Sequence, residues 1–156
     1  MGSEPIAADF VERMGVHFER MGIPRIGGRM LGLLMVCEQP LALDDLARRL
    51  CVSRASVSNN LRLFGQLGLV ERVPVPGERR RCFGVSANAY ALRLEGVARD
   101  GASLRRAVEV GLASVEPGSR AHARLREAEA FAAFLEEEAR GMSERWQARL
   151  ARLAAP

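Results

Sequence analysis

The apolar residues of the chain recur at the three- and four-residue spacing of amphipathic helices, apart from one central stretch with a strand-like pattern. The first helical run ends at Gly22, and Ser3 is placed to cap its start. Its apolar positions lie about one turn apart and comprise Ile6, Phe10, Met14, Phe18 and Met21. We expect this helix to bury that face in a core or against a second copy of the chain.

A second helix is predicted to begin at Pro24, which suits a first helical turn, and to run to about Glu38. Its inward positions are apolar and comprise Ile26, Met30, Leu33, Leu34 and Cys37. Gly27, Gly28 and Gly32 each weaken a helix by about 1 kcal/mol relative to alanine. Glycines gathered in one helix therefore predict that another helix approaches it closely.

The next stretch has the pattern of a helix-turn-helix. Leu43–Leu50 predicts a helix of about two turns with Asp44 and Asp45 at its positive end. After a short turn, Ser53 is a natural N-cap for a second helix that ends at Gly68. The buried positions of this second helix are Val57, Leu61, Phe64 and Leu67, and its opposite face presents Arg54, Ala55, Ser58, Asn59 and Arg62. Two short helices with a tight turn, the second covered by small polar and arginine side chains, are typical of this motif.

Strand-like segments lie on both sides of the helix pair. Residues 39–42 fit a short edge strand, and residues 69–73 and 81–85 fit a hairpin whose connection carries Arg79 and Arg80 at its tip. A hairpin directly after a helix-turn-helix is typical of a winged helix. A merely solvated hairpin is the alternative, and the preceding helix pair favours the wing.

The last third of the chain is predicted to form two helices separated by Pro117 and Gly118. The first begins near Asn88, and its apolar face comprises Leu94, Val97, Leu104, Val108, Leu112 and Val115. The second carries a heptad-like seam of Ala121, Leu125, Ala128, Ala132, Leu135, Ala139, Met142 and Trp146. Because a small monomer rarely needs so long a stripe, we expect the terminal helices to form a dimer interface. The expected interface residues are Phe10, Met14, Leu125, Leu135, Met142 and Trp146.

These elements predict a mainly α fold, in which a three-helix core and a β-hairpin wing form a winged helix-turn-helix with N- and C-terminal dimerisation helices. The expected divisions are an N-terminal helix at 1–22, a DNA-binding domain at 23–88 and a C-terminal dimerisation region at 89–156. With 156 residues, of which 48% are hydrophobic, the chain can bury a core without metals or disulfides.

The charge is unevenly distributed along the chain. Residues 46–93 contain nine arginines and two acids and carry +7, whereas residues 1–45 carry −3 and residues 94–156 are neutral. All 23 basic residues are arginine. The cationic third coincides with the predicted helix-turn-helix and wing, which is the charge pattern expected of a surface that binds a polyanion such as nucleic acid.

Several other classes of protein find no support in the sequence. Three widely spaced cysteines and two histidines disfavour a zinc site or a disulfide framework, and no cofactor is expected. No apolar run is long enough to span a membrane, and no secretion signal opens the chain, so we expect a cytoplasmic protein without a membrane partner. No catalytic triad order, metal-spaced ligand set or glycine-rich phosphate loop indicates an enzyme.

Two motifs resemble those of bacterial GbsR/MarR-type winged-helix transcriptional regulators. The segment Gly22–Gly32 opens with Gly-Ile-Pro-Arg, which favours the GbsR-like branch, and Leu61–Arg72 ends in Leu-Gly-Leu-Val-Glu-Arg, which is common among MarR-like proteins. The resemblance covers about residues 10–90. It implies a homodimer that binds double-stranded DNA at a pseudopalindromic operator, usually as a repressor, and leaves it when a small ligand binds.

If the second helix of the motif enters a major groove, its exposed side chains have distinct expected contacts. Arg54 suits guanine, Asn59 suits adenine, and the Ala55 methyl suits a thymine methyl. Ser58 lies on the same face, near the base edges. Phosphates are the expected partners of Ser53, Ser56 and Arg62, although Ser53 fits a helix cap better than a base contact and Arg62 fits a surface ion pair as well.

On the wing, Arg79 and Arg80 are expected to reach a minor groove or the DNA backbone. The wings of the family often carry an acid after these arginines, whereas Arg81 continues the basic run here. This departure predicts a stronger and less selective attraction to the backbone.

Two alternatives to an operator-binding regulator remain open. One is a winged helix that binds a protein partner, although the position of the basic third counts against it. The other is a repressor that senses oxidants through Cys37 or Cys82, since positive charge favours a thiolate. An unidentified small-molecule effector is expected, but the aromatic residues outside the DNA-binding core fit core packing better than a cage for a cationic ligand.

Overall fold

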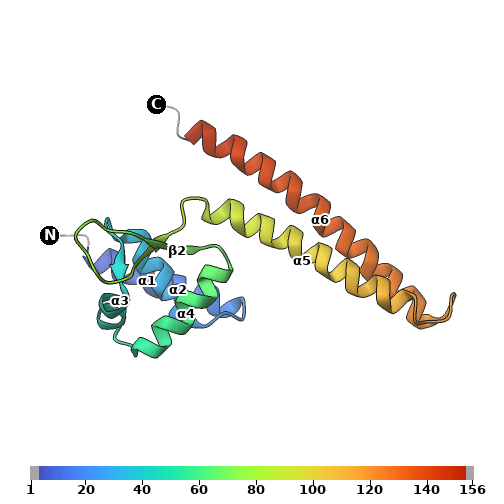
Figure 1. Cartoon of the computed structure of the whole chain (residues 1–156), viewed down its shortest axis with the longest axis horizontal. Helices are drawn as coiled ribbons and strands as arrows, with labels where there is room; N and C mark the ends of the chain where they lie inside the picture. Colours follow the sequence, from blue (N-terminus) through green and yellow to red (C-terminus); the bar gives the residue numbers. More distant parts are fainter. Residues whose placement is uncertain (1–3, 154–156) are drawn as a thin grey trace. The chain divides into compact units, whose positions relative to one another are not determined.

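The computed structural model describes residues 4–153, with side chains from Ala8 onward (Figure 1). Within that range the chain forms six helices and three short strands, which divide into a first compact unit ending at Ala89 and a second beginning at Tyr90. The predicted cap at Ser3 lies outside the described residues. None of the helices in this range is long and apolar enough to cross a membrane.

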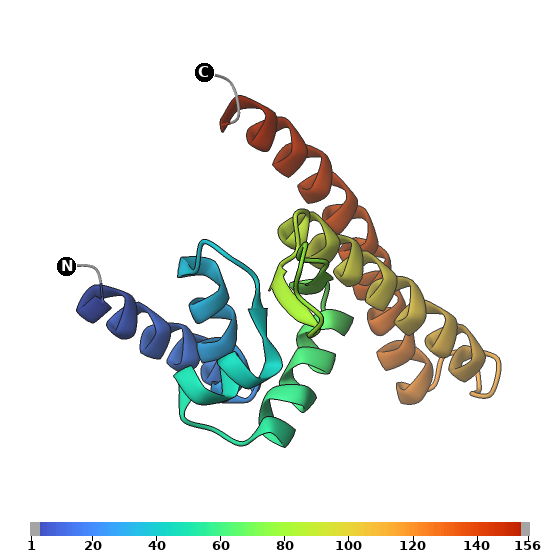
Figure 2. The same ribbon diagram turned by 60° about the vertical axis from the view of Figure 1, so that its left-hand side comes forward.

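Helices α1 (Glu4–Arg20) and α2 (Arg25–Val36) pack against each other through glycines. A Cβ atom at Gly28 would lie 2.4 Å from the carbonyl oxygen of Met14, and one at Gly32 would lie 3.0 Å from the Met14 Cβ. The other face of α2 meets α4, so that α2 lies between the two helices (Figure 2). The close helix approach predicted from the glycines is therefore confirmed.

The helix-turn-helix consists of α3 (Leu43–Leu50) and α4 (Arg54–Gln66), within one or two residues of the predicted bounds. The turn bends at Cys51, the one described residue other than glycine with a positive φ, at 54°. Ser53 caps α4, because its hydroxyl oxygen accepts a hydrogen bond of 3.1 Å from the backbone N–H of Ser56. The most deeply buried side chains of the core are Phe64, Met30, Leu46 and Val57.

The three strands form one small antiparallel sheet in the order β1-β3-β2. Strands β2 (Val70–Val73) and β3 (Cys82–Val85) are the arms of the wing, and β1 (Leu41–Ala42) pairs with the other edge of β3. The register places Leu41 opposite Phe83 and Val73 opposite Cys82. Both the hairpin and the short edge strand were predicted, and pairing through β3 ties the wing to the start of α3.

The second unit is a hairpin of two long helices, α5 (Ala89–Leu112) and α6 (Arg120–Leu153). Small residues at their contact let them approach closely: a Cβ at Gly101 would lie 3.1 Å from the Ala132 carbonyl oxygen, and one at Gly111 would lie 3.3 Å from a methyl of Leu125. Ala132 and Ala139 are almost fully buried. Part of the predicted heptad seam thus packs against α5 of the same chain.

Prediction: Gly28→Ala destabilises the protein. Its methyl group would lie against a backbone oxygen that cannot rotate away, so α1 and α2 have to separate. We expect a loss of about 1–3 kcal/mol in the free energy of unfolding, measured by denaturant titration. Gly65→Ala in α4 is the matched control, since its nearest neighbour would be 3.7 Å away. Equal stability of the two variants would contradict the close contact.

Candidate nucleic-acid interface

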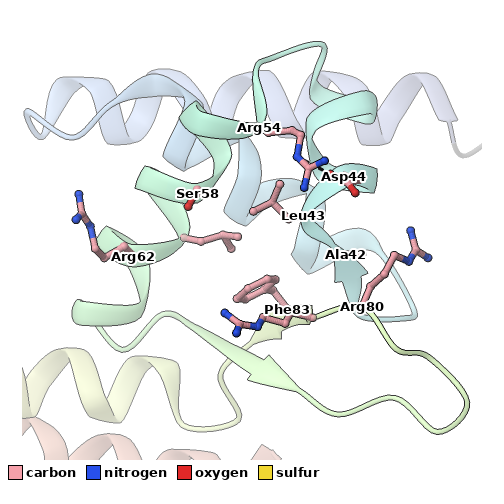
Figure 3. Close-up of a pocket in the computed structure, with 10 residues that line it drawn as sticks. Ala42, Leu43, Asp44, Arg54, Ser58, Arg62, Arg80 and Phe83 are labelled. Carbon is pink, nitrogen blue, oxygen red and sulfur yellow. Dashed lines mark ion pairs between the residues drawn. The ribbon is translucent and has the colours of Figure 1, made fainter.

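A hollow of about 460 Å³ opens in the first unit where α3, α4 and the wing meet (Figure 3). Its floor is apolar and includes Leu43, Leu61 and Phe83. Its polar lining consists of Asp44, Arg54, Ser58, Arg62, Arg80 and Arg81. Four guanidinium groups from the second helix of the motif and from the wing thus gather around one site, as the charge distribution of the sequence predicted.

The outer face of α4 carries the side chains predicted to contact bases. Arg54, Ala55, Ser58 and Asn59 are exposed, and so is Arg62 one turn further along. The Ser53 hydroxyl oxygen accepts the capping hydrogen bond, and its exposed O–H can still donate to a phosphate, whereas Ser56 is half-buried. The exposed stripe therefore runs along α4 from its first turn to Arg62.

Arg54 contacts the helix that precedes it. Its Nε lies 2.9 Å from Oδ1 of Asp44 in the first turn of α3, while 74% of its side chain is exposed. The pair joins the two helices of the motif across their connecting turn. This ion pair is not among the contacts that the sequence predicted for Arg54.

All three nitrogens of the Arg80 guanidinium group donate to carboxylates. Its Nε and Nη2 donate to Oε2 of Glu78 at 3.1 and 2.6 Å, and its Nη1 donates to Oδ2 of Asp45 at 3.0 Å. These contacts fix the wing to α3. One N–H on each terminal nitrogen stays uncommitted, and half of the side chain is exposed, so Arg80 is a partly paired arginine rather than the free arginine expected at the tip. Arg79 and Arg81 are exposed and form no ion pair with the described side chains.

Asn60 is a polar residue of α4 that the sequence analysis missed. It is 6% exposed and points to the core, where its Nδ2 donates to the Ser56 carbonyl oxygen at 2.8 Å. Its Oδ1 has no hydrogen-bond partner among the described residues and faces Gly27 of α2. The signal was present, because residue 60 falls three residues after Val57 on the buried face.

The two cysteines considered as oxidant sensors lie in different surroundings. Cys82 is buried and its thiol points to the Arg80 carbonyl oxygen, whereas Nη1 of Arg49 lies 3.5 Å from the sulfur of half-buried Cys37. Of these two cysteines, Cys37 fits the thiol-sensor alternative better, because it is partly exposed and lies beside a guanidinium group. No group of three or more potential metal ligands occurs among the described residues.

Of the residues predicted for a dimer interface, Met14 packs on α2, and Leu125 and Leu135 pack toward glycines of α5. Phe10 is half-buried. Met142 is exposed, and Trp146 is half-buried with its ring 5.6 Å from that of Tyr90 in an edge-to-face arrangement. Met142 and Trp146 both line a hollow of the second unit.

Prediction: the Glu78 carboxyl titrates near pH 2. Its hydrogen bonds from Arg80 lower its pKa from about 4.5 to about 2. A depressed pKa means that the wing contact stabilises the fold above about pH 4.5 and loses that effect as the pH falls toward 2. An NMR titration of the carboxyl carbon measures this pKa directly, and Arg80→Gln should return it toward the ordinary value. An ordinary pKa in the unmodified protein would show that the contact is absent in solution.

Comparison with known proteins agrees with this geometry. Residues 22–81 match the model of the MarR family, and residues 97–149 match that of the MmpR5-like MarR family transcriptional regulators. The chain is 37% identical over 139 residues to the HTH-type transcriptional regulator MmpR5 of Mycobacterium tuberculosis, covering 87% of this chain and 84% of that protein. It is 26% identical over 81 residues to the putative HTH-type transcriptional regulator YvaV of Bacillus subtilis, covering 52% and 46%.

A crystal structure of a transcriptional regulator also matches, with a TM-score of 0.83 and 33% identity over 92% of this chain and 99% of that one. The mainly helical winged-helix fold is thereby confirmed, while the finer placement in a GbsR-like branch stays a prediction. The long alignment to MmpR5 spans both compact units rather than the DNA-binding motif alone. The chain therefore belongs to the MarR family of winged-helix transcriptional regulators and is a regulator rather than an enzyme.

Proposed function

We propose that this chain is a cytoplasmic homodimeric repressor that binds double-stranded DNA at a pseudopalindromic operator. The observation that carries the proposal is the gathering of exposed arginines from α4 and the wing around one hollow of the first unit. A helix with small polar and arginine side chains fits a major groove, and a basic hairpin beside it fits the adjoining backbone or minor groove.

The contacts proposed for the residues follow from their surroundings. Arg54, Ala55, Ser58 and Asn59 lie along the exposed stripe of α4 and are assigned to base edges. Arg62 is assigned to a phosphate, since it is exposed on the same face closer to the end of the helix. On the wing, Arg79 and Arg81 are the arginines assigned to DNA, because the guanidinium group of Arg80 already has three carboxylate contacts.

Dimerisation is proposed from the apolar surface of the second unit. Large apolar side chains are exposed there, namely Leu104, Val110, Phe131, Phe134, Met142, Leu150 and Leu153. Phe131 and Phe134 are 54% and 58% exposed although they lie within one turn of each other on α6. Neighbouring exposed aromatic side chains mark an interaction surface. A second copy of the chain is the proposed partner, since a two-fold dimer would present two equivalent α4 helices to a pseudopalindromic operator.

Release by a small ligand is part of the proposal. The second unit contains a hollow of about 800 Å³, a volume within the range of small-molecule sites. It is lined by Tyr90, Leu94 and Trp146 together with arginines from α5 and α6.

Prediction: a random pool of DNA duplexes yields an inverted repeat after selection on the protein. The two half-sites should lie about one helical turn apart, because the two α4 helices of a dimer enter successive major grooves. The logarithm of the affinity for this site should fall steeply with the logarithm of the salt concentration, since arginines displace counterions from phosphates. Absence of enrichment, with weak binding at physiological salt, would turn the search to a protein partner.

Prediction: replacing both Phe131 and Phe134 by glutamate produces a monomer. Two charges cannot be buried in an apolar interface without a large desolvation cost, while both sites are exposed in the single chain. Light scattering should show half the mass, and circular dichroism should show unchanged helix content. Ala133→Glu is the control, because Ala133 is exposed on another side of α6. A dimer that survives the double substitution would place the interface elsewhere.

A further inference from the structure

Asp44 lies where it can determine how Arg54 is presented to DNA. It belongs to the first turn of α3, and 40% of its side chain is exposed, compared with 74% for Arg54. Figure 3 shows the two side chains facing each other at the rim of the hollow. The closest contact joins Oδ1 of Asp44 to Nε of Arg54, and not to either terminal nitrogen.

The nitrogen that is held decides which contacts the arginine can still make. A guanidinium group recognises guanine by donating two hydrogen bonds to O6 and N7, and its two terminal nitrogens can supply both when it approaches end-on. A carboxylate at Nε leaves that end of Arg54 available. Arg80 is the contrasting case, because its Nε and both of its Nη atoms donate to carboxylates. Arg54 thus contacts a carboxylate through Nε, whereas all three nitrogens of Arg80 contact carboxylates.

The contact between Asp44 and Arg54 is short, but it is not a well-aligned hydrogen bond. Oδ1 of Asp44 is buried and lacks a well-aligned hydrogen bond from any described residue, even though Nε of Arg54 is only 2.9 Å away. A buried acceptor without a donor is costly, and a small rotation of Arg54 would align the N–H with it. In the free protein the contact is therefore an ion pair without an aligned hydrogen bond.

We propose that Asp44 is a positioning residue that sets sequence specificity by holding Arg54 at Nε for end-on contact with a guanine. The proposal rests on the operator binding proposed above. It has two consequences of opposite sign for a variant that lacks the carboxylate. Loss of orientation weakens the preference for guanine, while loss of a negative charge near the phosphates strengthens binding to DNA of any sequence.

The test compares the unmodified protein with Asp44→Asn, Arg54→Ala and the double variant. Each is titrated with the selected site, with the same site in which single guanines are replaced, and with an unrelated duplex. A bidentate arginine contact is worth about 1–3 kcal/mol, so Arg54→Ala should lower the preference for one guanine about 5- to 150-fold. Asp44→Asn should lower the same preference at least about fivefold, and should add nothing in the Arg54→Ala background.

The unrelated duplex separates positioning from simple damage. Asp44→Asn should bind it as well as the unmodified protein does or better, whereas a misfolded variant would lose affinity for every duplex. Glu19→Gln is the charge-matched control, since Glu19 is exposed on α1, and its guanine preference should not change. Asp44→Glu is the second variant: it keeps the charge at the start of α3 but displaces the carboxylate by one methylene, and it should also lose preference for that guanine.

The outcomes distinguish this proposal from the one on which it rests. If the unmodified protein selects no sequence, operator binding fails and the role of Asp44 fails with it. If a site is selected but no guanine preference depends on Arg54, or if Asp44→Asn and Asp44→Glu keep that preference, operator binding stands and the role of Asp44 is overturned. An equal loss for every duplex, with a lowered unfolding midpoint, assigns Asp44 a structural role only and also overturns the proposal.

Discussion

The position of α4 depends on two glycines of α2, whose lack of a side chain lets the neighbouring helices approach. A Cβ at Gly27 would lie 2.3 Å from the ring of Phe64, and a Cβ at Gly28 would lie 2.4 Å from the Met14 carbonyl oxygen on the opposite face of α2. The helix is thus held on both sides at distances that only glycine allows. Because Phe64 and Val57 are fully buried against this layer, the exposed stripe of α4 is held at a fixed angle by the core behind it.

With α4 held by the core, the long arginine side chains are the part of this surface that can still change position. Acids of α3 restrain two of these arginines. These two adjacent acids act on different elements: Asp44 contacts Arg54 at the start of α4, and Asp45 contacts Arg80 on the wing. Asp45 also accepts from Arg48 of its own helix, so its carboxylate is the better anchored of the two. The surface ion pairs contribute little to stability because they are exposed. Their effect is on geometry, since they limit where two of the cationic groups can go.

The sequence predicted the local structure well because apolar spacing, caps and turn residues act over a few positions. Ser53 was identified as a cap from its place before an amphipathic run, and the glycines of α2 predicted a close helix contact. The ion pair between Asp45 and Arg80 could not be predicted, because those residues lie 35 positions apart and meet only after β1 pairs with β3. The seam of α6 was ambiguous for a related reason: periodicity shows that Leu125 and Leu135 need a partner, but not that α5 supplies one.

The three wing arginines differ in their ion pairs, because only Arg80 contacts carboxylates among the described residues. The run from Arg79 to Arg81 looks uniform in sequence, yet the backbone N–H of Arg80 also donates to Glu78 at 2.9 Å, which closes the tip and turns that guanidinium group toward α3. Arg79 and Arg81 are exposed as well, and neither forms an ion pair with a described side chain. A basic tip that was free at all three positions would attract any phosphate. Pairing Arg80 with two carboxylates lowers the uncompensated positive charge of the wing and holds the hairpin against α3.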